Sequence, residues 1–340
     1  MGLLFEDLKA LARSVRLALG LPAAVWFAGR NFSALAQAYE RTVAPILLRV
    51  VSESPVRASM DASLSVMSSK IGLAVLCYAR AVGGEPPLEV VVLAGACTRL
   101  YDDLIDDSPD RSADTRLARL FARTAEDGLC KQSDQEEPFG RSEAEVVLAR
   151  MIEAIVERTP TSSTVAAFTA LQELHMYQCL SRRQREPDIS LALIEEITRG
   201  KGAYANLVLC HLVRPEIPDA DRELAMRLGS CLQLLDDYMD LPYDQFNGIV
   251  TLASARSLSL AEVAERLRLV CRQLAHRHPG PGARRYGGMV YFLLLQAMAA
   301  RRFPALGRVA QRAARRSAAL RFTSRAAESL PAVVPQEGNR

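Results

Sequence analysis

The chain lacks the features that mark β-rich, disulfide-bonded or membrane-spanning proteins. Runs of alternating β-branched residues are nearly absent from its 340 residues, which argues against a β-sheet protein. Its seven cysteines are spread singly without a Cys-x-x-Cys pair, and their odd number argues against a disulfide framework. The longest uncharged stretch, 286–300, is too short to cross a membrane. We therefore expect a soluble protein of the reduced cytoplasm with no transmembrane segment.

A large excess of charge of either sign is also missing. The 42 basic and 39 acidic residues leave a net charge of +3, which is too small to indicate binding to nucleic acid. Lysine is scarce, with only Lys9, Lys70, Lys131 and Lys201 among the basic residues, so a lysine beside a candidate anion site is noticeable. The N-terminal stretch contains acidic residues and no small-residue cleavage site, which does not predict a secretory signal.

Helical periodicity of apolar residues runs along most of the chain and predicts an all-α protein. Breaks are expected at the stretches 83–87, 215–218 and 278–282, which are rich in Gly and Pro, and a polar surface loop is expected at 131–140. The expected helices span residues 34–52, 58–82, 87–107, 114–127, 141–158, 163–184, 190–213, 219–241, 258–277, 284–301 and 304–327.

No repeat and no shift in composition marks a domain boundary. We expect a single all-α domain over residues 1–327, followed by a disordered tail at 328–340. Helices of these lengths can surround a central apolar cavity, because sites in helical bundles are built from side chains on facing helices.

Two acidic clusters each close an apolar helical stretch. Residues 102–107 read Asp-Asp-Leu-Ile-Asp-Asp, and residues 236–240 read Asp-Asp-Tyr-Met-Asp. On a helix, residues four apart such as Asp102 and Asp106 share a face. Crowded carboxylates repel one another, and the C-terminal end of a helix disfavours negative charge, so both positions favour a bound cation. Mg²⁺ prefers oxygen ligands and leaves room for substrate phosphates.

A solvated acidic helix end is an ordinary interpretation of one cluster, but two clusters with the spacing Asp-Asp-x-x-Asp indicate a shared site. In these motifs the chain resembles the class I isoprenoid synthases, and most closely the trans-prenyl diphosphate synthases. The resemblance implies an all-α fold around a deep apolar pocket, where two such motifs bind three Mg²⁺ ions. The catalytic and metal-binding residues that it implies are Asp102, Asp103, Asp106, Asp236, Asp237 and Asp240.

Neighbouring residues extend the resemblance. Gln233 lies in the stretch 229–240, which matches the family pattern Gly-x-x-x-Gln-x-x-Asp-Asp-x-x-Asp. Lys201 lies in a segment similar to the one that carries a diphosphate-binding lysine. Arg111 stands where the family has the first arginine of a pair, and Lys70 stands at the lysine of a Gly-Lys-Arg-x-Arg motif. The resemblance therefore implies that these four side chains bind the substrate diphosphate.

Several positions depart from the family pattern. Ser112 replaces the second arginine of the pair, and Ile71 and Leu73 replace both arginines after Lys70. In the family, these arginines largely hold a second substrate, isopentenyl diphosphate, through charge-assisted contacts. The departures argue against a second diphosphate site. Asp244, four residues beyond the second motif, is interpreted either as a further metal ligand or as a solvated loop acid.

Three functions follow from this reading. The favoured one is a terpene synthase or cyclase that ionises a single allylic prenyl diphosphate with Mg²⁺. The second is a prenyltransferase that adds isopentenyl diphosphate or another acceptor, and the third is a non-catalytic regulatory subunit of such a synthase. Two points weigh against the cyclase: its second motif is of the Asp-rich type, and aromatic residues make up only 6% of the chain.

The remaining expectations concern surfaces and pocket shape. The basic stretch 301–325 is interpreted either as an amphipathic helix packed on the body or as a peripheral membrane contact. The resemblance implies a homodimer. Tyr101, with Cys97 and Thr98, is expected to line the pocket floor, whereas His175 is expected to pack in the interior.

Overall fold

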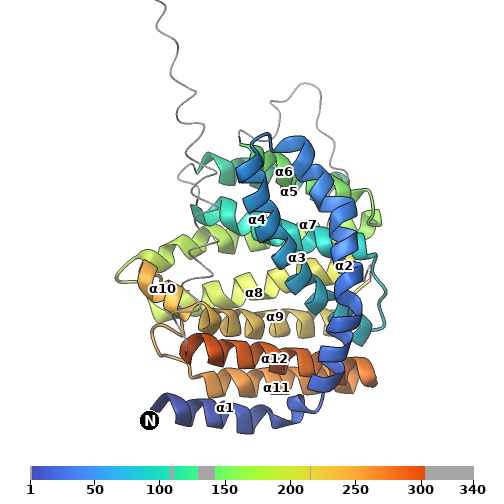
Figure 1. Ribbon diagram of the computed structural model, residues 1–340. Coiled ribbons are helices and arrows are strands. Elements are labelled where there is room, and N and C mark those ends of the chain that lie inside the picture. The colour runs from blue at the N-terminus through green and yellow to red at the C-terminus, as the bar shows by residue number, and fades with distance from the viewer. Residues whose placement is uncertain (1, 108–110, 129–141, 215, 303–340) are drawn as a thin grey trace, which may run out of the picture.

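The computed structural model describes residues 2–107, 111–128, 142–214 and 216–302 (Figure 1). This part of the chain is built from helices, and no strand occurs within it. The all-α class predicted from the sequence is therefore confirmed. The expected helix at 304–327 and the expected tail at 328–340 lie outside the described residues.

The helices follow one another through short connections. Their bounds are α1 (Gly2–Ala18), α2 (Leu21–Val50), α3 (Ser54–Ala81), α4 (Leu88–Asp107), α5 (Ser112–Asp127), α6 (Glu143–Val156), α7 (Thr161–Leu180), the 3₁₀ helix η1 (Ser181–Arg185), α8 (Leu191–Val213), α9 (Asp219–Met239), α10 (Leu241–Asn247), α11 (Leu260–Arg277) and α12 (Pro281–Arg302). Serines cap three of them: Ser142, Ser190 and Ser259 each accept a hydrogen bond from the backbone N–H three residues later.

The N-terminal region differs from the expectation. The first helix expected from the sequence spans 34–52, but α2 begins at Leu21 and α1 precedes it. Gly20 separates the two helices, and Pro22 lies in the first turn of α2, where a missing N–H removes no helical hydrogen bond. Pro45 is also accommodated inside α2. Gly and Pro in this region therefore begin a helix rather than exclude one.

Four of the later helices and α1 stack in successive layers. In Figure 1, α8, α9, α12, α11 and α1 follow one another toward the bottom of the view, and α2 runs along one edge of this stack. The most extensive helix contacts join α8 to α9, α7 to α8 and α3 to α4. The first acidic cluster lies on α4, which packs against α3, the helix that carries Lys70. The second cluster lies on α9, which packs against α8, the helix that carries Lys201.

Membrane-like character is limited to the first three helices of the described part. By length and apolarity alone, α3 could cross a membrane, and so could α1 and α2 if they were counted as one bent span. However, α3 packs against α2, α4 and α12, and 44% of its most apolar window is buried. A core helix has the same properties, so these helices provide no firm transmembrane segment.

Candidate functional site

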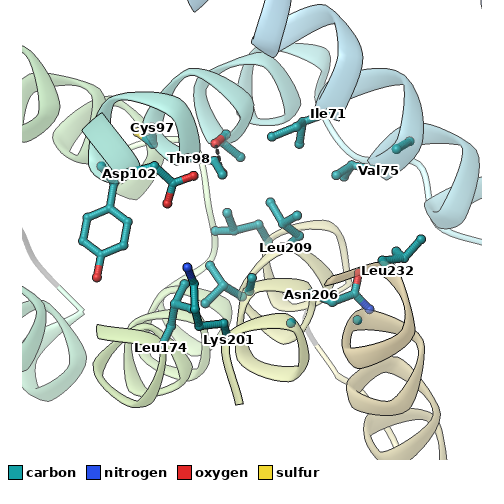
Figure 2. Close-up of a pocket in the computed structure, with 18 of the residues that line it drawn as sticks. Ile71, Val75, Cys97, Thr98, Asp102, Leu174, Lys201, Asn206, Leu209 and Leu232 are labelled. Carbon is teal, nitrogen blue, oxygen red and sulfur yellow. Dashed lines mark hydrogen bonds between the residues drawn. The ribbon is translucent and has the colours of Figure 1, made fainter. Parts of the chain in front are cut away.

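A pocket of about 380 Å³ lies among α3, α4, α7, α8 and α9. Most of its wall is apolar, and Figure 2 shows Ile71 and Val75 of α3 facing Leu209 of α8 and Leu232 of α9 across it. This volume falls within the range of about 300–1,000 Å³ that is usual for small-molecule pockets. An apolar wall of this kind suits a hydrocarbon chain and keeps water away from it.

Polar side chains line the same pocket. They are Lys70, Arg99, Thr98, Asp102, Gln178, Lys201, Asn206, Gln233 and Asp236. Figure 2 shows Asp102 and Lys201 extending into the pocket from α4 and α8. Asp102 belongs to the first acidic cluster and Asp236 to the second. One carboxylate of each cluster therefore borders the same space.

The first acidic cluster occupies the last turns of α4, where its members have different surroundings. Asp102 accepts a hydrogen bond from Gln178 Nε2 at 3.3 Å. Asp103 is buried and forms an ion pair with Arg99, one turn earlier, with 2.7 Å between Asp103 Oδ1 and Arg99 Nη2. Asp106 lies in the same helix, but its side chain is outside the described residues. Among the described side chains of this cluster, Asp102 borders the pocket.

The second acidic cluster closes α9. Asp236 lines the pocket, whereas Asp237 points into the interior and is buried. Asp237 Oδ1 accepts a hydrogen bond from Gln233 Nε2 at 3.2 Å, and its other carboxylate oxygen, Oδ2, is buried without a hydrogen-bond partner among the described residues. Asp240 is the C-cap of α9, and Asp244 follows on α10, where it is buried rather than solvated. A solvated loop position for Asp244 is therefore wrong.

These buried carboxyl groups hold their protons unusually well. Burial, followed by repulsion from Asp236, raises the pKa of Asp240 to about 7. Burial also raises the pKa of Asp237 to about 7. At Asp244, burial and the negative charges of the other three aspartates raise the pKa to about 8. Near neutral pH these three carboxyl groups are therefore partly protonated, and a bound cation can replace their protons.

The charge balance of this end of the pocket fits a divalent cation. The carboxyl groups of Asp236, Asp237, Asp240 and Asp244 act on one another electrostatically, and cations oppose them: Lys70 and Arg99 act on Asp240, and Lys201 acts on Asp237 and Asp244. Oxygen-rich donor sets suit Mg²⁺, and the unpartnered Oδ2 of Asp237 is a free donor atom in such a set. Within the described part of the chain, no three acidic, His or Cys side chains are already grouped around one point.

The predicted diphosphate-binding residues fall into two groups. Lys70, Lys201 and Gln233 line the pocket. Arg111 is exposed at the N-cap of α5 and is not among the pocket-lining residues. Three of the four predicted side chains are therefore together, and Arg111 stands apart from them in this conformation.

Arg99 and Gln178 also line the pocket, although neither belongs to the motifs singled out in the sequence. Arg99 lies four residues before Asp103, and this helical spacing of opposite charges is the sequence signal for it. Gln178 is 2% exposed and contacts Asp102 from another helix, so no local pattern marks it. Its role depends on how α7 packs, which the sequence alone does not give.

An aromatic cluster lies at the α5 and α7 side of the pocket. Tyr101, Phe121 and Phe168 line the wall, and the Tyr101 and Phe121 rings meet edge to face with centroids 5.8 Å apart. The Tyr101 hydroxyl lies 2.7 Å from Nδ1 of His175, which is buried. Tyr101 is thus confirmed as a pocket residue and His175 as an interior one. Although the chain has few aromatic residues, three of them line this side of the pocket.

The chain matches no protein-family model and no curated protein.

Proposed function

We propose that this protein binds one allylic prenyl diphosphate together with Mg²⁺ and ionises it, acting as a terpene synthase on a single substrate. The observation that carries this proposal is the shared pocket of Asp102 and Asp236: an aspartate from each Asp-Asp-x-x-Asp motif borders a largely apolar space that Lys70, Lys201 and Gln233 also line. A charged end and an apolar wall match the two parts of such a substrate.

Mg²⁺ bound by the aspartates of both motifs, with Asp244 as a further ligand, would neutralise the charge that develops on the departing diphosphate. Lys201 and Lys70 add positive charge at the same end of the pocket. When the carbon–oxygen bond breaks, its electron pair leaves with the diphosphate and a carbocation remains. Ile71, Leu209 and the neighbouring apolar side chains keep water away from that cation.

The aromatic cluster supports cyclisation of the cation rather than its transfer to a second diphosphate. The faces of Phe121, Phe168 and Tyr101 carry negative charge density that attracts a cation within about 6 Å. This counts in favour of a cyclase despite the low overall content of aromatic residues. The same proposal includes one domain with the pocket as its central cavity, a homodimer and a cytoplasmic location.

Prenyl transfer is the second candidate, and Arg99 is the observation that favours it. Arg99 and Lys70 line the pocket and act on the same aspartate, Asp240. Two cations from α4 and α3 could hold a second diphosphate where the arginines of the family pattern are missing. Arg99 is, however, already paired with Asp103, which reduces its availability.

The test is incubation of the purified protein with geranyl, farnesyl or geranylgeranyl diphosphate and Mg²⁺, with and without isopentenyl diphosphate. We expect release of diphosphate and a volatile hydrocarbon or alcohol without isopentenyl diphosphate. A longer prenyl diphosphate formed only in its presence would establish the second candidate. No release under any of these conditions would contradict both and leave the regulatory-subunit hypothesis.

Isosteric variants connect the activity to the site. Asp102→Asn and Asp236→Asn remove one charge each and should lower diphosphate release at least about 100-fold, because electrostatic stabilisation of the leaving group is the main catalytic contribution. Asp219→Asn is the matched control, since Asp219 is exposed in the first turn of the same helix as Asp236. Equal activity of all three variants would show that Asp102 and Asp236 take no part in catalysis.

A further inference from the structure

The first two helices expose an unusual amount of apolar surface. Seven of the thirteen large hydrophobic side chains that are exposed in the described part of the chain lie between residues 5 and 32. Single exposed apolar residues are common, but a contiguous patch of them marks an interaction surface. This surface is formed by α1 and the first turns of α2, at the outer edge of the helix stack (Figure 1).

On α1 the exposed apolar residues form one stripe. Phe5, Leu8, Val15 and Leu19 are spaced by three, seven and four residues, so they project from a single face at and just beyond the helix. The opposite face holds buried residues such as Ala10, and α1 packs there against α11 and α12. The stripe therefore points away from the body of the protein.

Further exposed apolar residues follow on α2, directly after the bend. Val25, Trp26 and Phe32 are exposed in its first turns, and 61% of Trp26 is accessible to solvent. The guanidinium of Arg30 lies over the Trp26 ring, 5.2 Å from its centroid. A Trp with an adjacent Arg is a combination suited to the boundary between lipid headgroups and acyl chains, where an apolar ring and a cation both find partners.

Basic residues border the stripe on α1. Lys9, Arg13 and Arg16 are exposed and lie side by side on a neighbouring strip of the helix. Lys9 pairs with Glu6 at 3.4 Å, whereas neither Arg13 nor Arg16 has a salt-bridge partner among the described residues. Arg13 lies within electrostatic range of Glu262 and Glu265 on α11, but neither arginine is held in an ion pair with a described residue, so both side chains are able to contact an anionic surface.

The two helices are held in a fixed relation. They meet at a bend of 69°, where the backbone of Gly20 touches that of Gly288 on α12 so closely that a Cβ on either residue would overlap the other chain segment. Arg284 on α12 donates a hydrogen bond to Leu19 O at 3.2 Å. Because the bend is anchored to the body, the stripe and Trp26 are presented without a disorder-to-order step.

We propose that the surface of α1 and α2 binds an anionic lipid membrane. The apolar stripe would enter the acyl boundary, and Arg13, Arg16 and Arg30 would contact lipid phosphates. A symmetric contact with a second copy of the chain is less favoured, since it would bring the same cations of both copies together at one interface. The proposal does not depend on the proposed enzymatic function.

Trp26 allows a direct test, because it is the only tryptophan of the chain. Full-length protein is mixed with vesicles of equal parts phosphatidylcholine and phosphatidylglycerol, and with vesicles of phosphatidylcholine alone. We expect a blue shift of the Trp26 emission and quenching by lipids brominated in their acyl chains with the anionic vesicles. High salt should weaken both effects, since it screens the attraction.

Surface variants separate this site from nonspecific adsorption. Leu19→Ser should lower the vesicle affinity about tenfold, because it removes one inserted apolar side chain. Arg13→Glu combined with Arg16→Glu should abolish the preference for anionic lipid. Leu48→Ser is the matched control, since Leu48 and Leu19 are 66% and 65% exposed but Leu48 lies near the far end of α2.

Two results would overturn the proposal. One is the absence of any change in Trp26 emission with anionic vesicles. The other is a blue shift that rises with protein concentration in the absence of lipid, together with a doubled mass in sedimentation. That second result would assign the surface to contact between two copies.

Discussion

Gly202 of α8 and Gly229 of α9 are in direct backbone contact. A Cβ added to Gly229 would overlap the carbonyl oxygen of Gly202, and a Cβ added to Gly202 would lie only 2.7 Å from Gln233 Cβ. The contact lets the two helices approach as closely as their backbones permit. It brings Lys201, the neighbour of Gly202, and Gln233, one turn after Gly229, to the wall of one pocket.

Gly229→Ala should therefore destabilise the protein. The added methyl group cannot be accommodated by a side-chain movement, because it meets backbone, and overpacking of this kind costs about 1–3 kcal/mol. The measurement is the free energy of unfolding in denaturant. Gly29→Ala is the control: a Cβ there meets nothing within 4 Å, so this variant should gain about 0.5–1 kcal/mol from helix propensity. An unchanged stability of Gly229→Ala would show that the helices separate without penalty.

The buried aspartates predict a pH dependence for the metal-free protein. The pKa of Asp237 and Asp240 rises from 3.8 to about 7 on folding, and that of Asp244 rises to about 8. The folded state then binds more protons than the unfolded state, so this contribution to stability is complete below pH 4 and is lost as the pH rises through 7 to 8. Thermal unfolding in a chelator should therefore give a falling melting temperature between pH 6 and about 8.

Added Mg²⁺ should reverse this loss. Metal binding requires deprotonated carboxylates, so Mg²⁺ should raise the melting temperature more at pH 8 than at pH 6 and release protons when it binds. Asp244→Asn should reduce the pH dependence of the metal-free protein, because it removes the group with the highest pKa of the three. A melting temperature that responds neither to pH nor to Mg²⁺ in this range would contradict the assignment of these groups.

The sequence predicts the helical class and the residues that lie at the site better than it predicts what each of these residues contacts. Helical periodicity is a local property of the sequence, so it predicts α4 and α9 together with the acidic clusters at their C-terminal ends. That Asp102 and Asp236 border one pocket depends on packing, and the resemblance to isoprenoid synthases supplied this expectation. Arg111 shows the limit of such a transfer, since a matching position in the sequence left it exposed at the start of α5.

The N-terminal helices show why the rest was not predictable. Gly20, Pro22 and Gly29 lower the helix propensity of their region, and local reasoning therefore begins the first helix later than the structure does. Tertiary contacts overrule this weak preference: Gly20 fits against Gly288, and Phe27 packs beneath the guanidinium of Arg285, 4.3 Å from its ring centroid. These partners lie on α12, far along the chain, where no local pattern indicates them.

Lys201→Gln should impair substrate binding more than folding. The lysine lines the pocket and opposes the negative charge of Asp237 and Asp244. Its loss removes a charge-assisted contact to a diphosphate, so we expect the affinity for a prenyl diphosphate to fall about tenfold or more. Binding is measured by calorimetry in Mg²⁺. Arg199→Gln is the matched control, because Arg199 is exposed on the same helix and does not line the pocket.

Tyr101→Phe tests the link between the pocket wall and the interior. His175 Nε2 lies 2.9 Å from the carbonyl oxygen of Asp114, which can only accept, so Nε2 carries the proton. Burial lowers the pKa of His175 and keeps the ring neutral, and Nδ1 therefore accepts from the Tyr101 hydroxyl. The variant leaves Nδ1 buried without its donor and should cost about 1–3 kcal/mol of unfolding free energy. Nitrogen chemical shifts of His175 should report the Nε2–H tautomer in the wild type. Tyr204→Phe should change stability little, because its ring is stacked on Tyr177 and its hydroxyl makes no hydrogen bond to a described residue. An equal loss in both variants would show that the hydrogen bond to His175 contributes nothing.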